Sequence, residues 1–188
     1  MKNLKTIAIA LLLVASTAVN AQNKKIDVKT SNIEWVGKKV TGQHNGTINF
    51  TEGTLVFKGK ALKGGSFTVD MNSINTTDLK AGEGKEKLDG HLKAEDFFGV
   101  DKYPTAKLVF KTISGKGKGI YKITANLTIK EVTELVSFDM NVTTNTATTK
   151  FNVNRTKFGI KYGSGSFFEN LGDKTISDDF ELAVNLKF

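Results

Sequence analysis

Apolar and polar residues alternate with a period of two along most of this chain. The clearest case is the C-terminal segment, where every second position from Phe180 to Phe188 carries a large apolar side chain. Tyr121–Ile129 and Val136–Val142 follow the same pattern. Because successive side chains of a strand point to opposite faces, each segment has one apolar and one polar face. The pattern predicts antiparallel strands that are buried on one side.

Turn signals rich in glycine and asparagine divide the alternating segments. Glu52-Gly53 separates two of them, and the run Ser114–Gly119 separates two more. On this basis we expect about eight or nine strands. Their approximate ranges are Asn32–Val40, Gln43–Phe50, Thr54–Lys60, Gly65–Ile74, Ala106–Ser114, Gly119–Ile129, Thr133–Thr143, Thr146–Val153 and Ile176–Phe188.

The apolar faces of these strands need a partner. No helix expected from the sequence is long enough to cover a sheet, so the faces must meet in a sandwich or a closed barrel. Connections are short except for the excursion at residues 75–104, which favours a meander. We predict an all-β fold, an antiparallel up-and-down barrel of about eight strands, with a short helical excursion near residues 78–98. No linker is visible, so we expect one domain over residues 22–188.

The N-terminal segment has the features of an export signal. A basic start precedes the apolar run Ile7–Val14, and Val19 and Ala21 suit the small-residue cleavage site. The apolar run is much shorter than the roughly 20 residues that span a bilayer. We therefore interpret residues 1–21 as a cleavable signal peptide and expect a soluble, exported, periplasmic protein without stable membrane insertion.

Composition excludes several classes of function. The formal charge is +8 at pH 7, but the cations are single lysines spread along the strands, and Arg155 is the only arginine. Nucleic-acid binding favours clustered Lys and Arg with interleaved aromatic residues, so we expect no such partner. The charge fits a solvated sheet face or attraction to anionic lipid headgroups or a pyrophosphate. The chain has no cysteine and two histidines, so we expect no disulfide, metal site or cofactor.

The sequence also offers little for catalysis. Asp178 and Asp179 are adjacent on an expected strand, so their carboxylates point to opposite faces and cannot form an acid–base pair. No G-x-S-x-G motif precedes an expected helix. The glycine-rich stretches Gly115–Gly119 and Gly163–Gly165 lack the strand-to-helix setting of a phosphate loop. We predict no catalytic residue.

The block Lys87–Pro104 breaks the strand pattern. Leu88 and Leu92 are one helical turn apart, and the adjacent Phe97 and Phe98 follow. Two neighbouring phenylalanines cannot both face water at low cost. The block therefore predicts a short helix that either plugs the barrel or gates a cavity inside it.

Several motifs together resemble the YceI family of exported polyisoprenoid-binding proteins. They are H-L-x-x-x-D-F-F and Y-P-T-A within His91–Ala106, L-T-I-K at Leu127–Lys130, and R-T-x-F-G-I at Arg155–Ile160. The resemblance runs through nearly all of residues 22–188. It implies a lipocalin-like barrel whose tunnel holds a long isoprenoid chain, of the prenyl quinone or polyprenyl phosphate type.

Three positions depart from the family pattern. Asn126 and Glu131 stand where glycines are usual, near the expected hairpin Lys130–Val132. Asn154 stands where an aspartate commonly precedes the arginine, which removes one local partner for Arg155.

The inward strand pattern and the resemblance together select a set of ligand-contacting residues. They are Trp35, Phe50, Phe67, Val69, Met71, His91, Leu92, Phe97, Phe98, Phe110, Ile123, Phe138, Met140, Phe151, Arg155, Phe158 and Phe180. For the phenylalanines the alternative is an ordinary filled core. For His91 the alternative is a half-buried histidine that is hydrogen-bonded to the backbone.

Two roles are open for Arg155. Arginine suits a site where a planar fork must grip a carboxylate or a phosphate. It therefore forms either an internal ion pair, with Asp96 or Asp178, or a rim site for a lipid headgroup together with Lys157 or Lys161.

The sequence thus favours a periplasmic carrier or reservoir for a polyisoprenoid lipid. An exported enzyme acting on a hydrophobic small molecule, and an interaction module with a filled barrel, remain as alternatives. Transient contact with a membrane surface and formation of a homodimer are left open.

Overall fold

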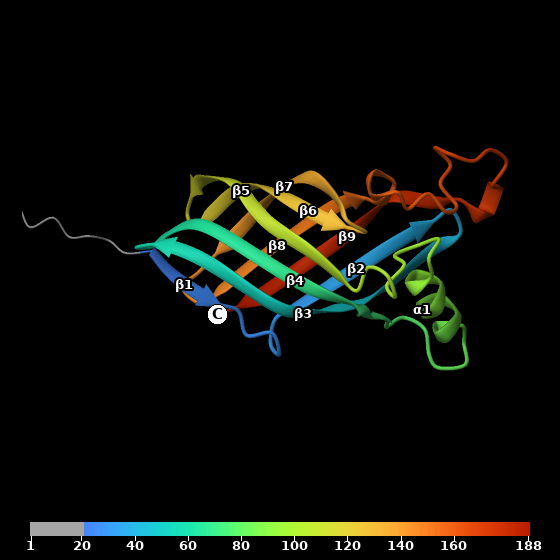
Figure 1. The fold of residues 1–188 in the computed structure, drawn as a ribbon, viewed down its shortest axis with the longest axis horizontal. Coiled ribbons are helices and arrows are strands. Elements are labelled where there is room, and N and C mark those ends of the chain that lie inside the picture. Colours follow the sequence, from blue (N-terminus) through green and yellow to red (C-terminus); the bar gives the residue numbers. More distant parts are fainter. Residues whose placement is uncertain (1–20) are drawn as a thin grey trace, which may run out of the picture.

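A computed structural model describes residues 21–188 as one antiparallel barrel (Figure 1). The predicted signal peptide lies outside the described residues except for Ala21. The strands are β1 (Ala21–Lys25), β2 (Asn32–Lys39), β3 (Gly42–Lys58), β4 (Ala61–Thr76), β5 (Thr105–Gly117), β6 (Ile120–Ile129), β7 (Val132–Val142), β8 (Thr146–Asn154) and β9 (Ile176–Lys187). The helices are α1 (Lys85–Lys93) and the 3-10 turns η1 (Arg155–Phe158) and η2 (Gly172–Lys174).

Strands β2 to β9 follow one another around the barrel in chain order. Each pairs with the next, and β9 returns to pair with β2, where Trp35 lies opposite Leu182. Eight strands therefore close the sheet, and β1 adds to the second half of β3, with Ala21 opposite Lys58. Closure removes most exposed strand edges and turns the apolar faces inward. The predicted fold class is confirmed.

One predicted turn is wrong. Glu52-Gly53 does not separate two strands, because Gln43–Phe50 and Thr54–Lys60 are parts of the single strand β3. A shift in the β3–β4 register between Phe50 and Glu52 marks a bulge there instead. A Cβ on Gly53 would lie 2.6 Å from Phe67 and 2.7 Å from Ile26. The glycine is present because two core side chains approach the backbone closely, and not because the chain reverses.

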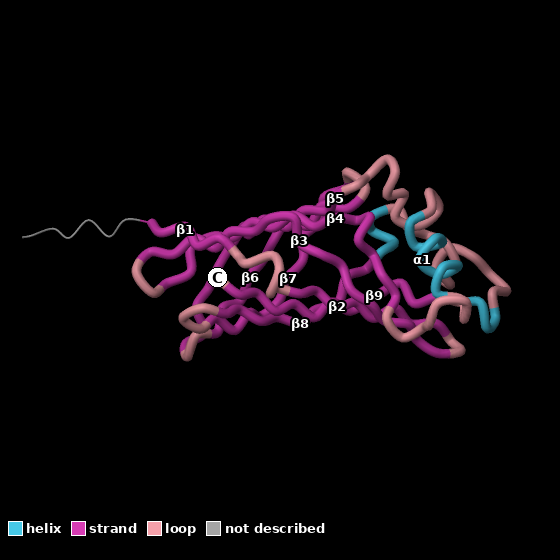
Figure 2. The backbone as a smooth tube through the Cα atoms, turned by 90° about the horizontal axis from the view of Figure 1, so that it is seen from below, coloured by secondary structure: helices cyan, strands magenta, loops and turns pink. Residues whose placement is uncertain are grey.

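The two ends of the barrel differ in their connections. At the end that we call the hairpin end, short turns join β3 to β4, β5 to β6 and β7 to β8. At the opposite end, the α1 end, lie both long connections, 77–104 and 155–175. Figure 2 shows the helices gathered at this end, beyond the edge of the strands.

Polar side chains fasten the first long connection to the barrel. Asp89 on α1 accepts hydrogen bonds from the Thr76 backbone N–H at 2.8 Å and from Lys85 Nζ at 2.5 Å. Lys130, in the β6–β7 hairpin, donates from Nζ to the carbonyl oxygens of Glu95 and Phe97, both at 2.9 Å. Side chains therefore provide the partners that the backbone of an irregular segment needs.

Candidate functional site

The barrel encloses an apolar cavity of about 180 Å³. A cavity needs a volume of only about 10–15 Å³ to hold one water molecule. The cavity extends from the α1 end to the middle of the barrel, between Phe98 and Met140. Beyond it, the hairpin end is filled by the fully buried Leu55, Ile123 and Ala147. The sheet therefore forms a pocket with a packed floor, and the long connections lie over its other end.

Fourteen of the seventeen predicted ligand residues line this cavity. Those that do not are His91, Ile123 and Phe158. Ile123 points inward but lies in the packed floor. Phe158 is buried in η1, outside the sheet. His91 packs its ring edge-on against Tyr162, at 4.5 Å between centroids, and against Phe97 at 5.5 Å.

The cavity wall includes further side chains that the predictions did not name. The apolar ones are Ile33, Ile48, Ile74, Ala106, Leu108, Leu127, Ile129, Ile176, Leu182, Val184 and Leu186. Most share the inward register of residues that were named, so the same alternation could have identified them. Leu182 and Val184, for example, follow Phe180 at two-residue steps.

Phe97 and Phe98 form the apolar underside of the first long connection. Phe97 is buried, Phe98 is half-buried, and both line the cavity with their rings edge-on at 5.2 Å. Phe98 also meets Phe180 of β9 edge-on at 6.3 Å. The pair therefore lies at the cavity's α1 end, where Phe97 belongs to the buried core and both rings face the cavity.

Strands β7 and β8 are joined only over a short stretch. Three residue pairs connect them, from Met140 opposite Thr149 to Val142 opposite Ala147. Towards the α1 end the pairing stops, and Phe138 and Phe151 stack there at 4.5 Å with an angle of 18° between their rings. Between β7 and β8, contact of two cavity-lining aromatic rings therefore takes the place of backbone hydrogen bonds.

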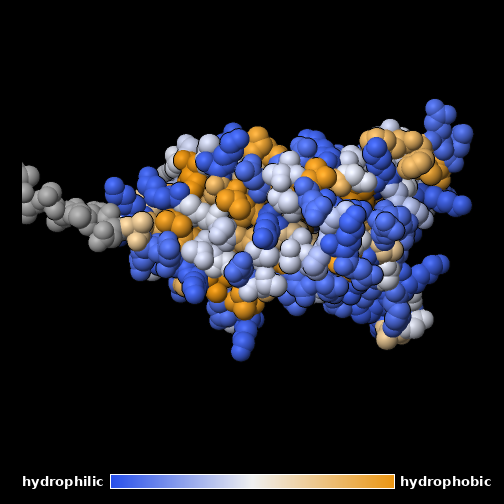
Figure 3. Space-filling model, viewed as in Figure 1, coloured by the Kyte–Doolittle hydropathy of each residue, from blue (hydrophilic) through white to orange (hydrophobic). Residues whose placement is uncertain are grey.

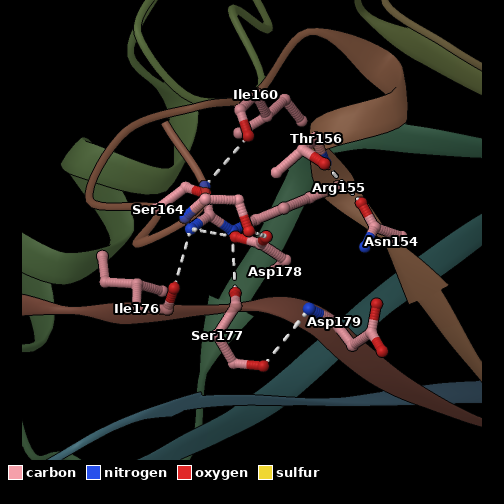
Figure 4. A network of polar contacts seen from close by, with 10 residues as sticks. Asn154, Arg155, Thr156, Ile160, Ser164, Ile176, Ser177, Asp178 and Asp179 are labelled. Carbon is pink, nitrogen blue, oxygen red and sulfur yellow. Dashed lines mark hydrogen bonds and ion pairs between the residues drawn. The ribbon is translucent and has the colours of Figure 1, made fainter. Parts of the chain in front are cut away.

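Arg155 is the polar centre of the α1 end (Figure 4). Its guanidinium donates to three carbonyl oxygens: Nε to Ser177 at 2.9 Å, Nη1 to Ile160 at 2.9 Å and Nη2 to Ile176 at 3.0 Å. Nη2 also lies 3.8 Å from Asp178 Oδ1. The side chain is almost fully buried, although it contributes to the cavity wall. It ties the turn after β8 to the start of β9.

The electrostatics of this pair fit a structural anchor. Burial lowers the pKa of Arg155, and the charge of Asp178 partly offsets that effect. Burial raises the pKa of Asp178, but hydrogen bonds from the Ser164 and Ser166 hydroxyls and the charge of Arg155 outweigh it, so the pKa lies below its usual value. Asp178 therefore remains a carboxylate at neutral pH. An acid–base catalyst instead needs a pKa near the working pH.

Of the two partners considered for Arg155, the structure shows Asp178. Asp96 instead lies 4.0 Å from Nδ1 of His91. Asn154, the departure from the family pattern, caps η1: its Oδ1 accepts hydrogen bonds from the Thr156 N–H at 3.1 Å and hydroxyl at 2.6 Å. The Lys157 and Lys161 side chains are exposed and do not line the cavity.

Besides Arg155, the polar residues of the lining are few: Lys38, Lys107, Thr149, Ser177 and Asp179. Lys38, Ser177 and Asp179 lie near the α1 end, where Lys39 of β2 is opposite Ile176 of β9. Within residues 21–188, no three His, Cys, Asp or Glu side chains gather as a metal site would require. Over the same residues, no helix has the length and apolar character to cross a membrane. The arrangement suits retention of an apolar molecule with one polar end.

A family model described as the YceI-like domain matches residues 25–188. The chain belongs to this family. A UPF0312 protein of Shewanella denitrificans is 29% identical to this YceI-like chain over 142 residues, which are 72% of this chain and 70% of the relative.

Solved structures show the same barrel. BcnA of Burkholderia cenocepacia superposes on this YceI-like chain with a TM-score of 0.69 and 22% identity, over 86% of this chain and 98% of BcnA. A polyisoprenoid-binding domain from Saccharophagus degradans, implicated in plant cell wall breakdown, matches with a TM-score of 0.57 and 13% identity, over 86% and 95% of the two chains. At these identities the likeness shows the fold.

Proposed function

We propose that this protein binds a polyisoprenoid lipid, of the prenyl quinone or polyprenyl phosphate type, with its chain in the barrel cavity. The observation that carries the proposal is a closed barrel whose cavity wall is almost wholly apolar and which still leaves about 180 Å³ unfilled. The polyisoprenoid-binding domain with the same fold supports this choice of ligand. The protein acts as a periplasmic carrier or reservoir in this proposal, and not as an enzyme.

Burial alone provides the affinity. Each methylene moved from water into the cavity contributes about 0.8 kcal/mol, so several isoprene units bind firmly without any charged contact. The headgroup then lies at the α1 end, where Lys38 and Asp179 reach the cavity. Arg155 is a weaker candidate for gripping it, because its guanidinium already donates to three carbonyl groups.

The deciding experiment is native mass spectrometry of the purified protein, followed by organic extraction. We expect a retained species whose mass corresponds to a prenyl lipid and which appears in the extract. A protein that carries no lipid, and that takes up none from added prenyl quinone or polyprenyl phosphate, contradicts the proposal.

A pair of variants links retention to the cavity. Ala106 lines the cavity, and Ala183 lies on β9 between the lining residues Leu182 and Val184 without lining the cavity itself. Ala106→Phe should fill the cavity and abolish lipid retention, whereas Ala183→Phe should leave retention unchanged. Circular dichroism of both variants shows whether the barrel is intact. Equal retention by the two variants contradicts a ligand in this cavity.

A further inference from the structure

The second long connection presents aromatic side chains to the surface. Phe167 is 48% exposed and Phe168 is 50% exposed, and Tyr162 nearby is also exposed. Adjacent exposed phenylalanines in an ordered segment are unusual, since their burial is favourable.

The backbone fixes these side chains in place. The N–H groups of Phe167 and Phe168 donate to the carbonyl oxygen of the buried Ser164, at 3.1 and 3.0 Å. The N–H of Ile176 donates to the Gly163 carbonyl oxygen at 2.8 Å. Backbone hydrogen bonds therefore hold this loop on both sides of Ser164, and Phe167 and Phe168 are exposed on an ordered segment.

Lysines accompany the exposed aromatic residues on the same connection. Lys161 Nζ lies 4.5 Å from the centre of the Phe167 ring, and Lys157 is exposed on the same connection. We call Lys157, Lys161, Tyr162, Phe167 and Phe168 the aromatic–lysine surface. Figure 3 shows apolar and hydrophilic side chains side by side at this end of the molecule, in the upper right of the view.

The neighbouring β2–β3 hairpin extends this surface. The N–H of its exposed tip residue Val40 donates to the Thr175 carbonyl oxygen at 3.2 Å, so the hairpin lies against the end of the connection. Lys38 and Lys39 are exposed on that hairpin, and Lys174 is exposed beside Thr175. Two exposed acids, Glu169 and Asp173, lie on the connection and leave lysine in excess.

We propose that the aromatic–lysine surface docks the protein on an anionic phospholipid bilayer. Aromatic rings insert at the headgroup level, and lysines are attracted to negatively charged lipids. A second copy of this chain fits less well, because a symmetric contact would bring the same lysines of both copies together. A bilayer satisfies both the aromatic and the cationic side chains at once.

Docking would also orient the cavity. The connection runs directly into Ile176 and Ser177, which line the cavity, so the surface and the cavity's α1 end share one segment. This consequence rests on the proposed lipid binding, whereas the docking itself does not.

Co-sedimentation with vesicles tests the proposal. The probe is a phosphatidylglycerol–phosphatidylethanolamine vesicle at low salt, with a phosphatidylcholine vesicle as the uncharged comparison. Phe167→Ser/Phe168→Ser should weaken partitioning to the anionic vesicle by roughly tenfold. Its matched control is Val109→Ser/Leu135→Ser, on the barrel wall, where the two side chains are 47% and 53% exposed.

A charge swap tests the lysines separately. Lys157→Glu/Lys161→Glu should also weaken binding to the anionic vesicle by roughly tenfold, since each lysine near such a surface contributes measurably. The matched control is Lys58→Glu/Lys60→Glu, two exposed lysines at the hairpin end. This control changes the net charge equally, so loss of binding in both variants would point to charge alone and overturn the assignment to this surface.

Two further outcomes overturn the proposal. One is unchanged vesicle binding by Phe167→Ser/Phe168→Ser. The other is a wild-type dimer in sedimentation velocity that this variant dissociates, because the surface would then belong to a second copy. Native mass spectrometry separates the two proposals. Phe167→Ser/Phe168→Ser that retains prenyl lipid but no longer binds vesicles supports docking by this surface. A folded wild-type protein that carries no prenyl lipid contradicts the proposed lipid binding in the cavity and leaves the docking proposal standing.

Discussion

The two ends of the barrel are held closed by different interactions. At the hairpin end, Phe57 and Phe188 pack at 5.8 Å, and Lys24 Nζ lies 5.3 and 5.0 Å from the two ring centres. The Leu62 N–H donates to the Tyr121 hydroxyl at 3.3 Å. At the α1 end the β7–β8 pairing stops, and single polar side chains such as Asp89 and Lys130 hold irregular backbone in place.

The difference indicates where the barrel can yield. Opening the hairpin end would break strand pairing and expose a dense apolar core, and both are costly. Opening the α1 end requires release of the first long connection, which Asp89 and Lys130 hold by hydrogen bonds and Phe97 holds by its burial, while the strands of the barrel stay paired. A ligand path through the α1 end therefore leaves the barrel intact.

Removal of the Arg155 side chain should have the largest effect on stability. Arg155→Met leaves the carbonyl groups of Ile160, Ile176 and Ser177 without their donor and removes the cationic partner of Asp178. Loss of one partner from a buried charged network costs about 3–5 kcal/mol. Urea unfolding of the wild type and the variant measures the difference.

Arg155→Lys distinguishes the anchor from a headgroup site. Lysine keeps the charge but cannot direct donors to three separate carbonyl groups, so the melting temperature should fall while prenyl lipid is still retained. Unchanged melting with weakened lipid binding would instead assign Arg155 to the headgroup.

A truncation at each end compares a packed floor with a cavity wall. Leu55→Ala removes a fully buried side chain at the hairpin end, and the free energy of unfolding should fall by about 2–5 kcal/mol. Phe98→Ala enlarges an existing cavity beside a half-buried ring, so its cost should be smaller. Lipid release, followed by transfer to acceptor vesicles, should accelerate in Phe98→Ala and remain near the wild-type rate in Leu55→Ala. The reverse order of release rates contradicts a path at the α1 end.

Asp89→Asn should loosen α1 by a smaller amount. Burial raises the pKa of Asp89, but hydrogen bonds from Lys85 and Thr76 outweigh it, so the pKa lies below its ordinary value of 3.8. The carboxylate therefore stabilises the folded state above pH 3.8 and loses that contribution as the pH falls below it. At pH 7 the variant should be about 1–2 kcal/mol less stable.

The difference between wild type and Asp89→Asn should shrink below pH 3.8. Asp70→Asn provides the control, since Asp70 lies on β4 and its carboxylate accepts a hydrogen bond from the Asn72 N–H, a residue of the same strand. Urea unfolding of the wild type and of each variant at pH 7 and at pH 3 measures these differences in the free energy of unfolding. A difference that is the same at the two pH values would contradict the role of the Asp89 charge.

Alternation predicted the barrel and which side chains point inward, because both depend on local strand geometry. It could not tell how deep along the barrel an inward residue lies, so Ile123 was grouped with cavity residues although it belongs to the packed floor. Strand β1 was missed because Ala21–Lys25 is polar and pairs with β3 through its backbone. The partners of Arg155 are backbone carbonyls brought together by tertiary structure, which leave no trace in the sequence.

The smallest effect is expected at the β6–β7 hairpin, where the sequence departs from the family pattern. Lys130 and Glu131 adopt positive φ values of 50° and 63°, a conformation that disfavours residues other than glycine. Glu131→Gly relieves this cost but makes the unfolded chain more flexible. The free energy of unfolding, measured in urea, should therefore rise by about 0.5 kcal/mol.

Lys130→Gly is the informative contrast, because it also removes the two hydrogen bonds to Glu95 and Phe97. It should release the first long connection and accelerate lipid exchange, whereas Glu131→Gly should leave exchange unchanged. Equal exchange rates in the two variants would show that Lys130 does not hold the α1 end closed.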